Sequence, residues 1–160
     1  MQYRTLSSPI GPLLLAGDDA GVRFLLFQHG RQSVRPQASW QPDRGRLKES
    51  VRQLTAYFEG RLQHFDVPVA PEGTPFQRAV WAELQRIPYG ETISYRTLAE
   101  RVGNPRAVRA VGLANGANPI SIIIPCHRVI GSNGSLVGYG GGLATKQALL
   151  ALERGQARLL

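Results

Sequence analysis

The chain contains a single cysteine, Cys126, which is followed directly by His127 and Arg128. A thiol becomes a useful nucleophile when a nearby base or positive charge lowers its pKa, so these residues form a candidate reactive site. Adjacent side chains point in different directions, and we therefore expect His127 to act on the thiol through a bridging water. A histidine base needs a third group that holds its tautomer, and Glu153 is the candidate. Without such neighbours, a lone cysteine is by default a small buried apolar residue.

The same cysteine count limits other kinds of chemistry. One cysteine cannot form an internal disulfide, and no set of Cys and His residues has the spacing of a zinc site. His29 and His64 are isolated in the sequence, and each is expected to be a surface or packing residue. We expect no metal and no cofactor.

A glycine-rich segment follows the cysteine. Asn133-Gly134 predicts a tight hairpin turn, and residues 137–142 (Val-Gly-Tyr-Gly-Gly-Gly) predict a flexible loop with an aromatic residue at its centre. Backbone N–H groups of such a loop can face a ligand, and Tyr139 can stack on a flat one. A run of glycines is more often simply a loop, so this segment alone indicates little.

Strand-like and helix-like patterns divide the chain into two parts. Strands are predicted at residues 2–6, 12–16 and 22–27, followed by a polar loop at 28–43 and a helix at 46–59. Residues 66–74 contain two prolines and a glycine and suit an extended linker. We therefore expect an α+β protein with a small N-terminal module and linker (residues 1–73) and a mostly helical C-terminal domain (residues 74–160).

The helical part begins with clear start signals. Thr74 can cap a helix, Pro75 fits its first position, and Gln77 completes a capping box. Residues 88–90 (Pro-Tyr-Gly) end this helix. Near the other end of the part, the apolar residues 120–124 predict a buried strand that runs into Cys126, and a last helix is predicted from Leu143 to about Glu153.

Two short helices between these elements have helix-turn-helix spacing. Ser94 can cap the first, which ends at Gly103, and Asn104-Pro105 predicts a second helix to about Asn115 after a turn of two or three residues. A recognition helix normally projects long polar side chains to base edges, whereas this one offers mainly small residues. It suits close backbone approach to a minor groove with one arginine inserted. Tight packing of two helices is the alternative explanation of its small residues, which are Ala107, Ala110, Gly112, Ala114 and Gly116.

The charge balance points to a polyanionic partner. The net charge is +8, and all basic residues except Lys48 and Lys146 are arginines. Basic groups that replace condensed counterions on phosphates favour nucleic acid, although a solvated basic surface explains the same number. The apolar runs are too short to span a bilayer, and the start of the chain lacks a secretory signal pattern, so a cytoplasmic location is expected.

Three motifs taken together resemble the O6-alkylguanine-DNA alkyltransferase family. They are Ile-Pro-Cys-His-Arg-Val at residues 124–129, Asn-Pro at 118–119, and Gly-Tyr-Gly-Gly-Gly-Leu at 138–143. The resemblance covers about residues 74 to 154. The N-terminal strands and helix are consistent with the small ribonuclease-H-like module of that family, but carry no diagnostic motif.

The resemblance implies a catalytic role for five residues. Cys126 resembles the alkyl acceptor, His127 the base that acts through water, and Glu153 the residue that orients the base. Asn118 resembles the asparagine that fixes the turn next to the thiol. Tyr95 resembles the tyrosine that helps to rotate the 3′ phosphate and donates a proton toward the departing guanine.

The resemblance also implies a DNA-binding surface and a guanine pocket. Arg109 resembles the residue that enters the base stack and fills the gap left by the extruded nucleotide. The other implied DNA contacts are Tyr95, Arg106, Ala107, Ala110, Gly112 and Ser132. The implied pocket consists of Tyr139, Gly140 and Val129, with Lys146 supporting the loop over it. Some relatives carry a serine where this chain has Gly140, which implies a roomier pocket that accepts alkyl groups larger than methyl.

The implied function is direct reversal of DNA damage. An alkyl group would pass from O6-alkylguanine in double-stranded DNA to Cys126 after the base is flipped out, and the stable thioether would allow each molecule to react only once. We expect a monomer in solution. The sequence leaves open whether the protein repairs O4-alkylthymine and whether it binds DNA cooperatively. Two alternatives compete: a non-catalytic binder of alkylated DNA, whose relatives lack the cysteine, and a cysteine hydrolase, which would leave the helix-turn-helix pattern unexplained.

Overall fold

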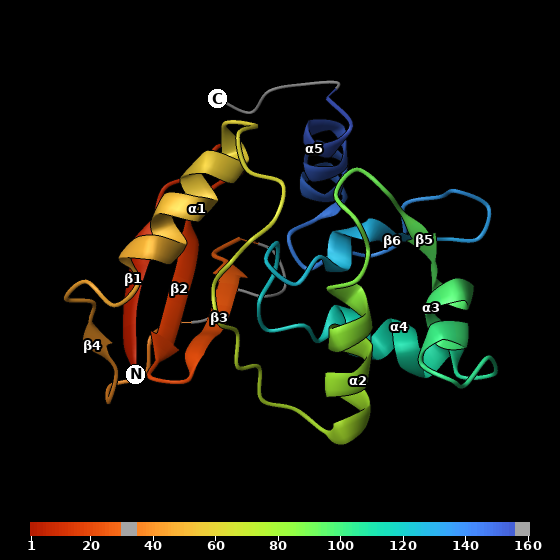
Figure 1. Cartoon of the computed structure of the whole chain (residues 1–160), viewed down its shortest axis with the longest axis horizontal. Helices are drawn as coiled ribbons and strands as arrows, with labels where there is room; N and C mark the ends of the chain where they lie inside the picture. Colours follow the sequence, from red (N-terminus) through yellow and green to blue (C-terminus); the bar gives the residue numbers. More distant parts are fainter. Residues whose placement is uncertain (30–34, 156–160) are drawn as a thin grey trace.

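The N-terminal half of the protein is a four-stranded sheet covered by one helix (Figure 1). The structure is a computed structural model and describes residues 1–29 and 35–155. Strand β2 pairs antiparallel with β1 and β3, and β4 joins β1 in parallel, giving the order β3-β2-β1-β4. The strands are β1 (Gln2–Leu6), β2 (Leu13–Asp18), β3 (Gly21–Phe27) and β4 (Gln41–Pro42).

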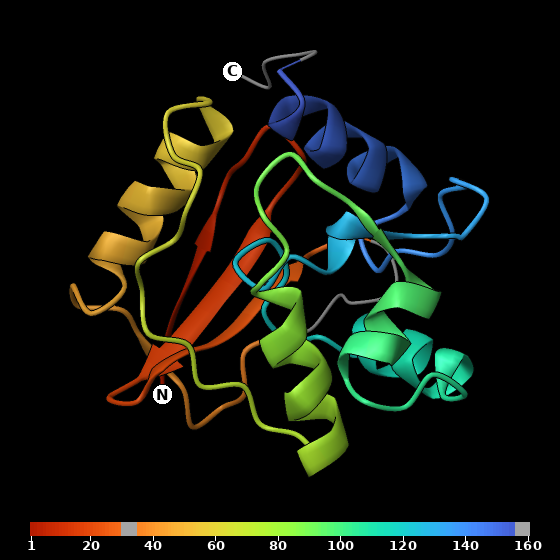
Figure 2. The same ribbon diagram turned by 45° about the vertical axis from the view of Figure 1, so that its right-hand side comes forward.

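Helix α1 (Lys48–Phe58) lies across one face of this sheet, as Figures 1 and 2 both show. The three predicted long strands and the predicted helix are confirmed. Strand β4 falls within residues 28–43, which we expected to be a loop throughout, and part of that segment lies outside the described residues. Strand β4 pairs with β1 at only two positions. Two residues are too few to show the alternation of apolar and polar side chains from which a strand is predicted.

The C-terminal half is mostly helical. Its elements are α2 (Pro75–Leu84), β5 (Ile93–Ser94), α3 (Tyr95–Arg101), α4 (Val108–Gly116), the short 3₁₀ helix η2 (Cys126–Arg128), β6 (Val129–Ile130) and α5 (Leu143–Glu153). The predicted capping box is present, since Thr74 Oγ1 accepts from the Gln77 N–H at 3.1 Å and Gln77 Oε1 accepts from the Thr74 N–H at 3.0 Å. Ser94 caps α3 by accepting from the Thr97 N–H at 3.0 Å.

Helix α4 begins later than the sequence predicts. Asn104 does not cap it, and Pro105 is not its first residue; the Ala107 N–H instead bonds the Asn104 carbonyl at 3.0 Å, which closes a turn. Proline fits the second position of such a turn as well as the start of a helix, so its presence does not separate the two. The connection from α3 is therefore longer than the two or three residues expected, and α4 has no side-chain cap.

The apolar run at 120–124 is not a strand, contrary to the prediction. Residue 120 makes one bridge to Leu25, and residues 121–124 form a turn in which Ile122 has a φ of 71°. The side chain of Asn118 closes this turn by accepting from the Ile120 N–H at 2.9 Å and donating to the Ile124 carbonyl at 2.8 Å. Because an asparagine side chain satisfies the backbone groups, this segment stays buried without a strand ladder.

The two halves meet along β3 and share one hydrophobic core. The Leu25 N–H donates to the Pro119 carbonyl, and the Ser121 N–H donates to the Leu25 carbonyl, each at 2.9 Å. Buried side chains from both halves, including Tyr57 and Trp81, belong to one continuous cluster. The bonds of Leu25 to Pro119 and Ser121 therefore fix the turn that precedes Cys126 directly against the N-terminal sheet.

Within the described part of the chain, no helix is long and apolar enough to cross a membrane.

Candidate active site

Cys126 is the first residue of η2 and lies directly after the turn that Asn118 closes. Its N–H donates to the Ile124 carbonyl at 2.8 Å, and its own carbonyl lies 3.4 Å from Asn115 Nδ2. Only 3% of the residue is exposed. The backbone on both sides of the thiol is therefore held in place, and the side chain is buried.

His127 is completely buried and is oriented by Glu153. Its Nε2 lies 2.7 Å from Glu153 Oε2, and because the carboxylate accepts, Nε2 carries the proton in this bond. The other ring nitrogen, Nδ1, is buried and has no hydrogen-bond partner among the described residues. Burial lowers the pKa of His127, and its bond to Glu153 only partly opposes this effect. His127 is thus a neutral imidazole with a free lone pair on Nδ1, which is the form that a base requires.

Glu153 is saturated with hydrogen-bond donors. Besides His127, its carboxylate accepts from Tyr57 Oη at 2.6 Å, from Arg128 Nε at 2.7 Å and from Arg128 Nη2 at 3.1 Å. Burial alone would raise the pKa of this carboxyl, but the hydrogen bonds and charges of His127 and Arg128 outweigh burial and hold the pKa well below its ordinary value. Glu153 is therefore ionised, and Arg128 neutralises its charge.

Arg128 is itself held by two further contacts. Its Nη1 donates to the Ile87 carbonyl at 2.7 Å, and its guanidinium lies 5.7 Å from the centre of the Tyr89 ring. A buried ion pair of this kind is stable only when its remaining donors are satisfied, and here they are. We name the set Cys126, His127, Arg128, Glu153 and Tyr57 the buried relay.

The thiol of Cys126 differs from the sequence-based expectation. We expected its neighbours to lower its pKa, but burial raises the pKa, and contacts with Asn118, Lys146 and Tyr139 offset only part of that rise. The prediction was wrong because it considered the neighbours and not the loss of solvent. The raised pKa favours the protonated thiol at neutral pH, so a nucleophilic role for Cys126 would require a base to remove this proton.

A cavity of about 350 Å³ lies next to the relay. Tyr95 and Gly112 form part of its wall, together with Asn115, Gly116, Val137, Gly138, Tyr139 and Gly140. Two of these side chains present buried oxygens that have no hydrogen-bond partner among the described residues, namely Asn115 Oδ1 and Tyr139 Oη. Unpartnered buried polar atoms are costly unless a ligand or water satisfies them. Both side chains also contact Cys126, so the thiol lies behind the inner wall of this cavity.

Lys146 ties the cavity loop to the rest of the site. Its ammonium donates to the carbonyls of Val129 at 2.7 Å and Val137 at 3.1 Å, and it lies 5.9 Å from the centre of the Tyr95 ring. Val129 and Lys146 are both buried behind the loop and are not part of the cavity wall. Lys146 therefore acts on the shape of the cavity through β6 and the loop.

The N-terminal half supports the same loop from the other side. The Phe27 ring meets the Tyr139 ring edge-on with centroids 5.6 Å apart, and His29 Nε2 lies 2.9 Å from the Gly141 carbonyl. A Cβ atom on Gly141 would lie 2.8 Å from the Phe27 ring, so only glycine fits there. His29 is thus a packing residue, as expected, and its partner is the loop that covers the cavity.

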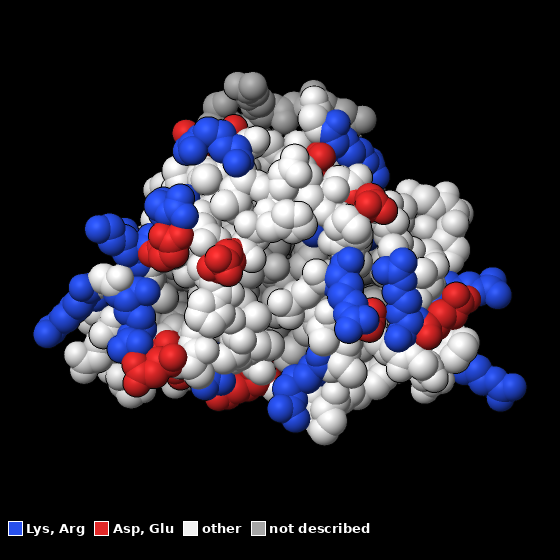
Figure 3. Space-filling view, in the orientation of Figure 1, with Lys and Arg blue, Asp and Glu red and all other residues white. Residues whose placement is uncertain are grey.

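The residues expected to contact DNA lie outside the relay. Arg106, Arg109, Ala110 and Ser132 are exposed, Ala107 is half-buried against the core, and Gly112 belongs to the cavity wall. Leu113 on α4 is 72% exposed. On the face drawn in Figure 3, basic and acidic side chains are interspersed over both halves instead of forming one basic patch.

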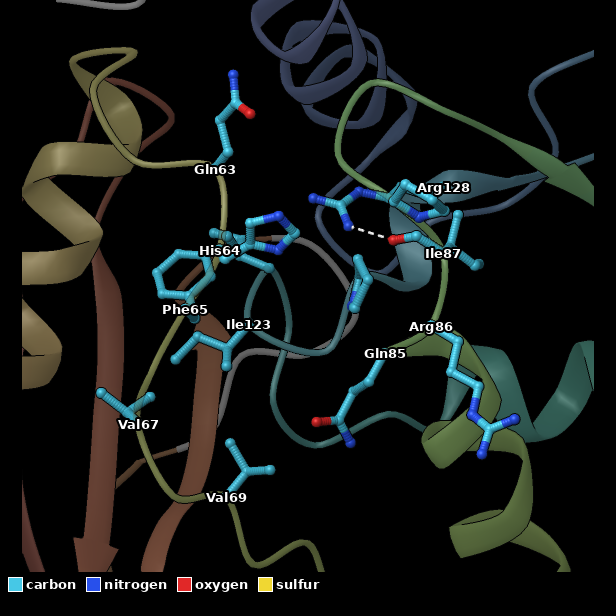
Figure 4. A pocket seen from close by; sticks show the side chains of 13 residues that line it. Gln63, His64, Phe65, Val67, Val69, Gln85, Arg86, Ile87, Ile123 and Arg128 are labelled. Carbon is cyan, nitrogen blue, oxygen red and sulfur yellow. Dashed lines mark hydrogen bonds between the residues drawn. The ribbon is translucent and has the colours of Figure 1, made fainter.

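A second groove of about 220 Å³ is separate from the cavity beside Cys126. Figure 4 shows Gln63 and His64, from the segment after α1, on one side and Gln85, from the end of α2, on the other. Arg128 borders this groove while its side chain bonds Ile87. Neither wall includes Cys126 itself, but Asn115 and Tyr139, which contact Cys126, line only the larger cavity.

Three residues of the site carry no role in the sequence-based assignment. In the sequence, Arg128 is only a nearby charge, Asn115 only the end of a helix, and Tyr57 only a residue of the helix predicted at 46–59. The Cys-His-Arg string places Arg128 beside the site, so a pairing with the candidate carboxylate could have been proposed. No local signal marks Tyr57, whose partner Glu153 is 96 residues away. Among the described residues, no group of three or more His, Cys, Asp or Glu could hold a metal ion.

Comparisons with known proteins agree with this architecture. Residues 75–155 match the model described as the 6-O-methylguanine DNA methyltransferase DNA binding domain, and residues 1–71 match the ribonuclease-like domain of the same family. The chain is 54% identical over 153 residues to a methylated-DNA–protein-cysteine methyltransferase of Methanosarcina acetivorans, covering 96% of this chain and 98% of that one. It is 52% identical over 158 residues to the Mycobacterium tuberculosis protein of the same name, covering 98% and 94%.

Solved structures show the same likeness. The crystal structure of Mycobacterium tuberculosis OGT in complex with DNA matches with a TM-score of 0.91 at 52% identity, covering 98% of this chain and 95% of that one. The crystal structure of the O6-methylguanine methyltransferase from the same organism matches with a TM-score of 0.89 at 53% identity, covering 98% and 94%.

Proposed function

This chain belongs to the 6-O-methylguanine DNA methyltransferase family, and we infer that Cys126 is the residue that receives the alkyl group. It is a DNA-repair protein that transfers a methyl group from DNA to a cysteine of its own, which reverses the damage directly. Cys126 is the only cysteine in the sequence. The observation that supports its role most directly is that the next residue, His127, is a neutral imidazole whose buried Nδ1 has no hydrogen-bond partner among the described residues.

The cavity next to Cys126 is where we place the alkylated base. Its volume of about 350 Å³ lies in the range of small-molecule pockets, and Tyr139 and Asn115 supply free polar atoms inside it. An O6 atom inside a DNA duplex cannot reach a buried sulfur, so the nucleotide has to flip out, at a cost of about a few kcal/mol. Gly140 leaves this part of the wall without a side chain, which supports acceptance of alkyl groups larger than methyl.

The transfer itself is a displacement at a saturated carbon. His127 Nδ1 takes the proton of the thiol through a water, and the sulfur attacks the alkyl carbon as the bond from that carbon to O6 breaks. The electrons of that bond pass to the guanine, which is neutralised by a proton from Tyr95 and by N–H donation from the Gly140 backbone. Burial raises the pKa of Tyr95, so its hydroxyl keeps the proton that it has to donate. The product is a thioether, which water does not readily cleave, so each molecule reacts once.

Helix α4 is the element that we place against DNA. Its exposed small residues allow a close approach to a groove, and Arg109 in its first turn is long enough to enter the base stack. Helix α3, the connection and α4 would then act as a helix-turn-helix unit. The division at residue 73 is supported by family matches that end at residue 71 and begin again at residue 75. A DNA partner supports a cytoplasmic, nucleoid-associated location.

Mass spectrometry tests the acceptor role. After incubation with duplex DNA carrying O6-methylguanine, the peptide that contains Cys126 should gain the mass of one methylene group. The Cys126→Ser variant should bind the same DNA and gain nothing. Binding without any mass gain in the parent protein would instead indicate a non-catalytic binder of alkylated DNA, and repeated turnover would indicate a hydrolase.

A further inference from the structure

Tyr57 belongs to the N-terminal half, but its hydroxyl group reaches the buried relay. It lies in the last turn of α1 and is completely buried. Its Oη donates to Glu153 Oε2 at 2.6 Å, across 96 residues of sequence. A phenol is neutral at physiological pH, so it can supply this hydrogen bond without adding a charge to the site.

The ring of Tyr57 is fixed by a set of aromatic neighbours. The rings of Phe58, Phe65 and Tyr89 have centroids 5.5, 5.4 and 6.3 Å from that of Tyr57. Burial first, and then the charge of Glu153, raises the pKa of Tyr57 well above its ordinary value. The hydroxyl therefore keeps its proton and its direction, and it can only donate to the carboxylate.

Tyr57 and His127 share the same oxygen of Glu153. His127 Nε2 lies 2.7 Å from Oε2, which also accepts from Tyr57 Oη. A donor to a carboxylate stabilises its charged form and reduces how strongly that oxygen attracts a second donor. Glu153 is also the last residue of α5, where a helix is least constrained, so an anchor from another part of the chain matters there.

We propose that Tyr57 is a positioning residue for alkyl transfer, which holds Glu153 so that His127 stays oriented and neutral. This proposal rests on the function proposed above and adds that the N-terminal half completes the reactive site. Tyr57 does not touch the thiol or the cavity; it acts through Glu153 alone.

Other charged or titratable groups also face this part of the site and have to stay constant in a test. Arg128 pairs with Glu153, Tyr89 packs against Tyr57, and Lys146 acts on His127 from α5. Cys126 and Tyr139 lie on the cavity side. A substitution that changes only the Tyr57 hydroxyl replaces none of these groups. A shift in the pH profile would therefore report the bond between Tyr57 and Glu153.

The Tyr57→Phe variant removes this hydroxyl and keeps the ring. Without the donor, the charge of Glu153 acts more strongly on His127, so the pKa of the histidine rises. We expect methyl transfer at neutral pH to be about 3- to 10-fold slower, which is the size of the net effect of one typical hydrogen bond. The acidic limb of the rate profile should move to higher pH by about half a unit. The measurement is the single-turnover transfer rate at saturating DNA as a function of pH.

A second variant gives the opposite expected shift and keeps the hydroxyl. Replacing Tyr57 alone by 3-fluorotyrosine makes the phenol a stronger donor, because fluorine withdraws electrons from the ring. The carboxylate is then better stabilised, and the acidic limb should move to lower pH. This variant is nearly isosteric, so it remains informative if Tyr57→Phe is too unstable to purify.

Tyr89→Phe is the matched control. It removes a hydroxyl from the same aromatic cluster and should keep the parent pH profile. If neither change at Tyr57 moves the acidic limb, or if both move it in the same direction, the proposal is overturned and Tyr57 is a packing residue only. Because the parent protein is measured in the same assay, such a result would leave the acceptor role of Cys126 intact. A parent that transfers nothing would instead contradict the proposed function.

Discussion

The buried relay and the exposed surface of α4 differ in almost every physical respect. In the relay, Glu153 accepts four hydrogen bonds, and His127 and Tyr57 are completely shielded from water. On α4, Arg109 and Ala110 are exposed, the helix has no side-chain cap, and Leu113 points a large apolar side chain into solvent.

This difference separates two tasks. The groups that we propose to act on the proton of the thiol are fixed before any substrate arrives, since their partners lie inside the protein. The side chains of Arg106 and Arg109, which we propose to meet DNA, have no hydrogen-bond or ion-pair partner among the described residues, so their arrangement can be completed on binding. Changes in the relay should therefore affect chemistry and stability together, whereas changes on α4 should affect recognition and leave stability unchanged.

The largest effect is expected from Glu153→Gln. The neutral amide cannot hold the His127 tautomer as a carboxylate does, and transfer should fall by about 100-fold or more. Arg128 would also be left as a buried charge without its partner, which costs about 3 kcal/mol of unfolding free energy. Single-turnover transfer and denaturant unfolding measure the two effects. Glu91→Gln, at an exposed position, is the control. If both variants had the same transfer rate and the same unfolding free energy, the buried relay would not differ from the exposed surface.

Arg109→Ala should reveal the opposite pattern. We expect transfer from duplex DNA to fall by about 10-fold or more, because nothing fills the gap left by the flipped base. The reaction with free O6-benzylguanine should be unchanged, since a free base needs no flipping, and the midpoint of thermal unfolding should stay the same. Arg61→Ala removes an exposed arginine of the N-terminal half and controls for net charge. A loss of activity toward the free base would show that Arg109 acts on the relay.

Acid should weaken the relay in two stages. Burial holds the pKa of His127 below its usual 6.5, so folding favours the neutral ring, and the resulting stability is lost as the pH falls below 6.5. The pKa of Glu153 is held below its usual 4.5, so its contribution is present above that pH and is lost on further acidification. Denaturant unfolding between about pH 7.5 and pH 3.5 would show both stages. A flat profile would mean that neither group is coupled to folding.

The smallest effect is expected from Ser132→Ala. Ser132 is exposed in the turn after β6, on the side of the molecule assigned to DNA. Loss of one hydroxyl contact to a phosphate should weaken DNA binding by about 2- to 5-fold without changing transfer to Cys126 at saturating DNA. Ser135→Ala in the same turn is a neighbouring control. A slower reaction at saturation would indicate that this turn helps to form the cavity.

Local signals explain which parts of the fold the sequence predicts. The capping residues Thr74, Gln77 and Ser94 act on atoms within three residues of themselves, so their helices were predicted correctly. The run at 120–124 was misjudged because burial on all sides produces the same apolar composition in a strand and in a buried turn. Only the tertiary contacts of Asn118 and Leu25 distinguish the two.

The site divides in the same way. The sequence names the Cys-His-Arg string and Glu153, and the structure joins His127 and Arg128 to Glu153 in one hydrogen-bonded group that directly follows Cys126 in the chain. Tyr57 was missed because its partner lies far along the chain, and the raised pKa of Cys126 was missed because burial is a property of the whole fold. Residue types thus predict which groups can react, whereas their protonation depends on packing that no short segment specifies.

The contact between Tyr57 and Glu153 has a consequence for biosynthesis. At the usual rates of translation, the 96 residues that separate them take roughly 5 to 20 s to synthesise. During that time the N-terminal half can fold, but the helix that supplies the carboxylate has not yet left the ribosome. A nascent chain therefore carries a Tyr57 hydroxyl that still lacks its acceptor, and the buried relay is complete only when α5 docks.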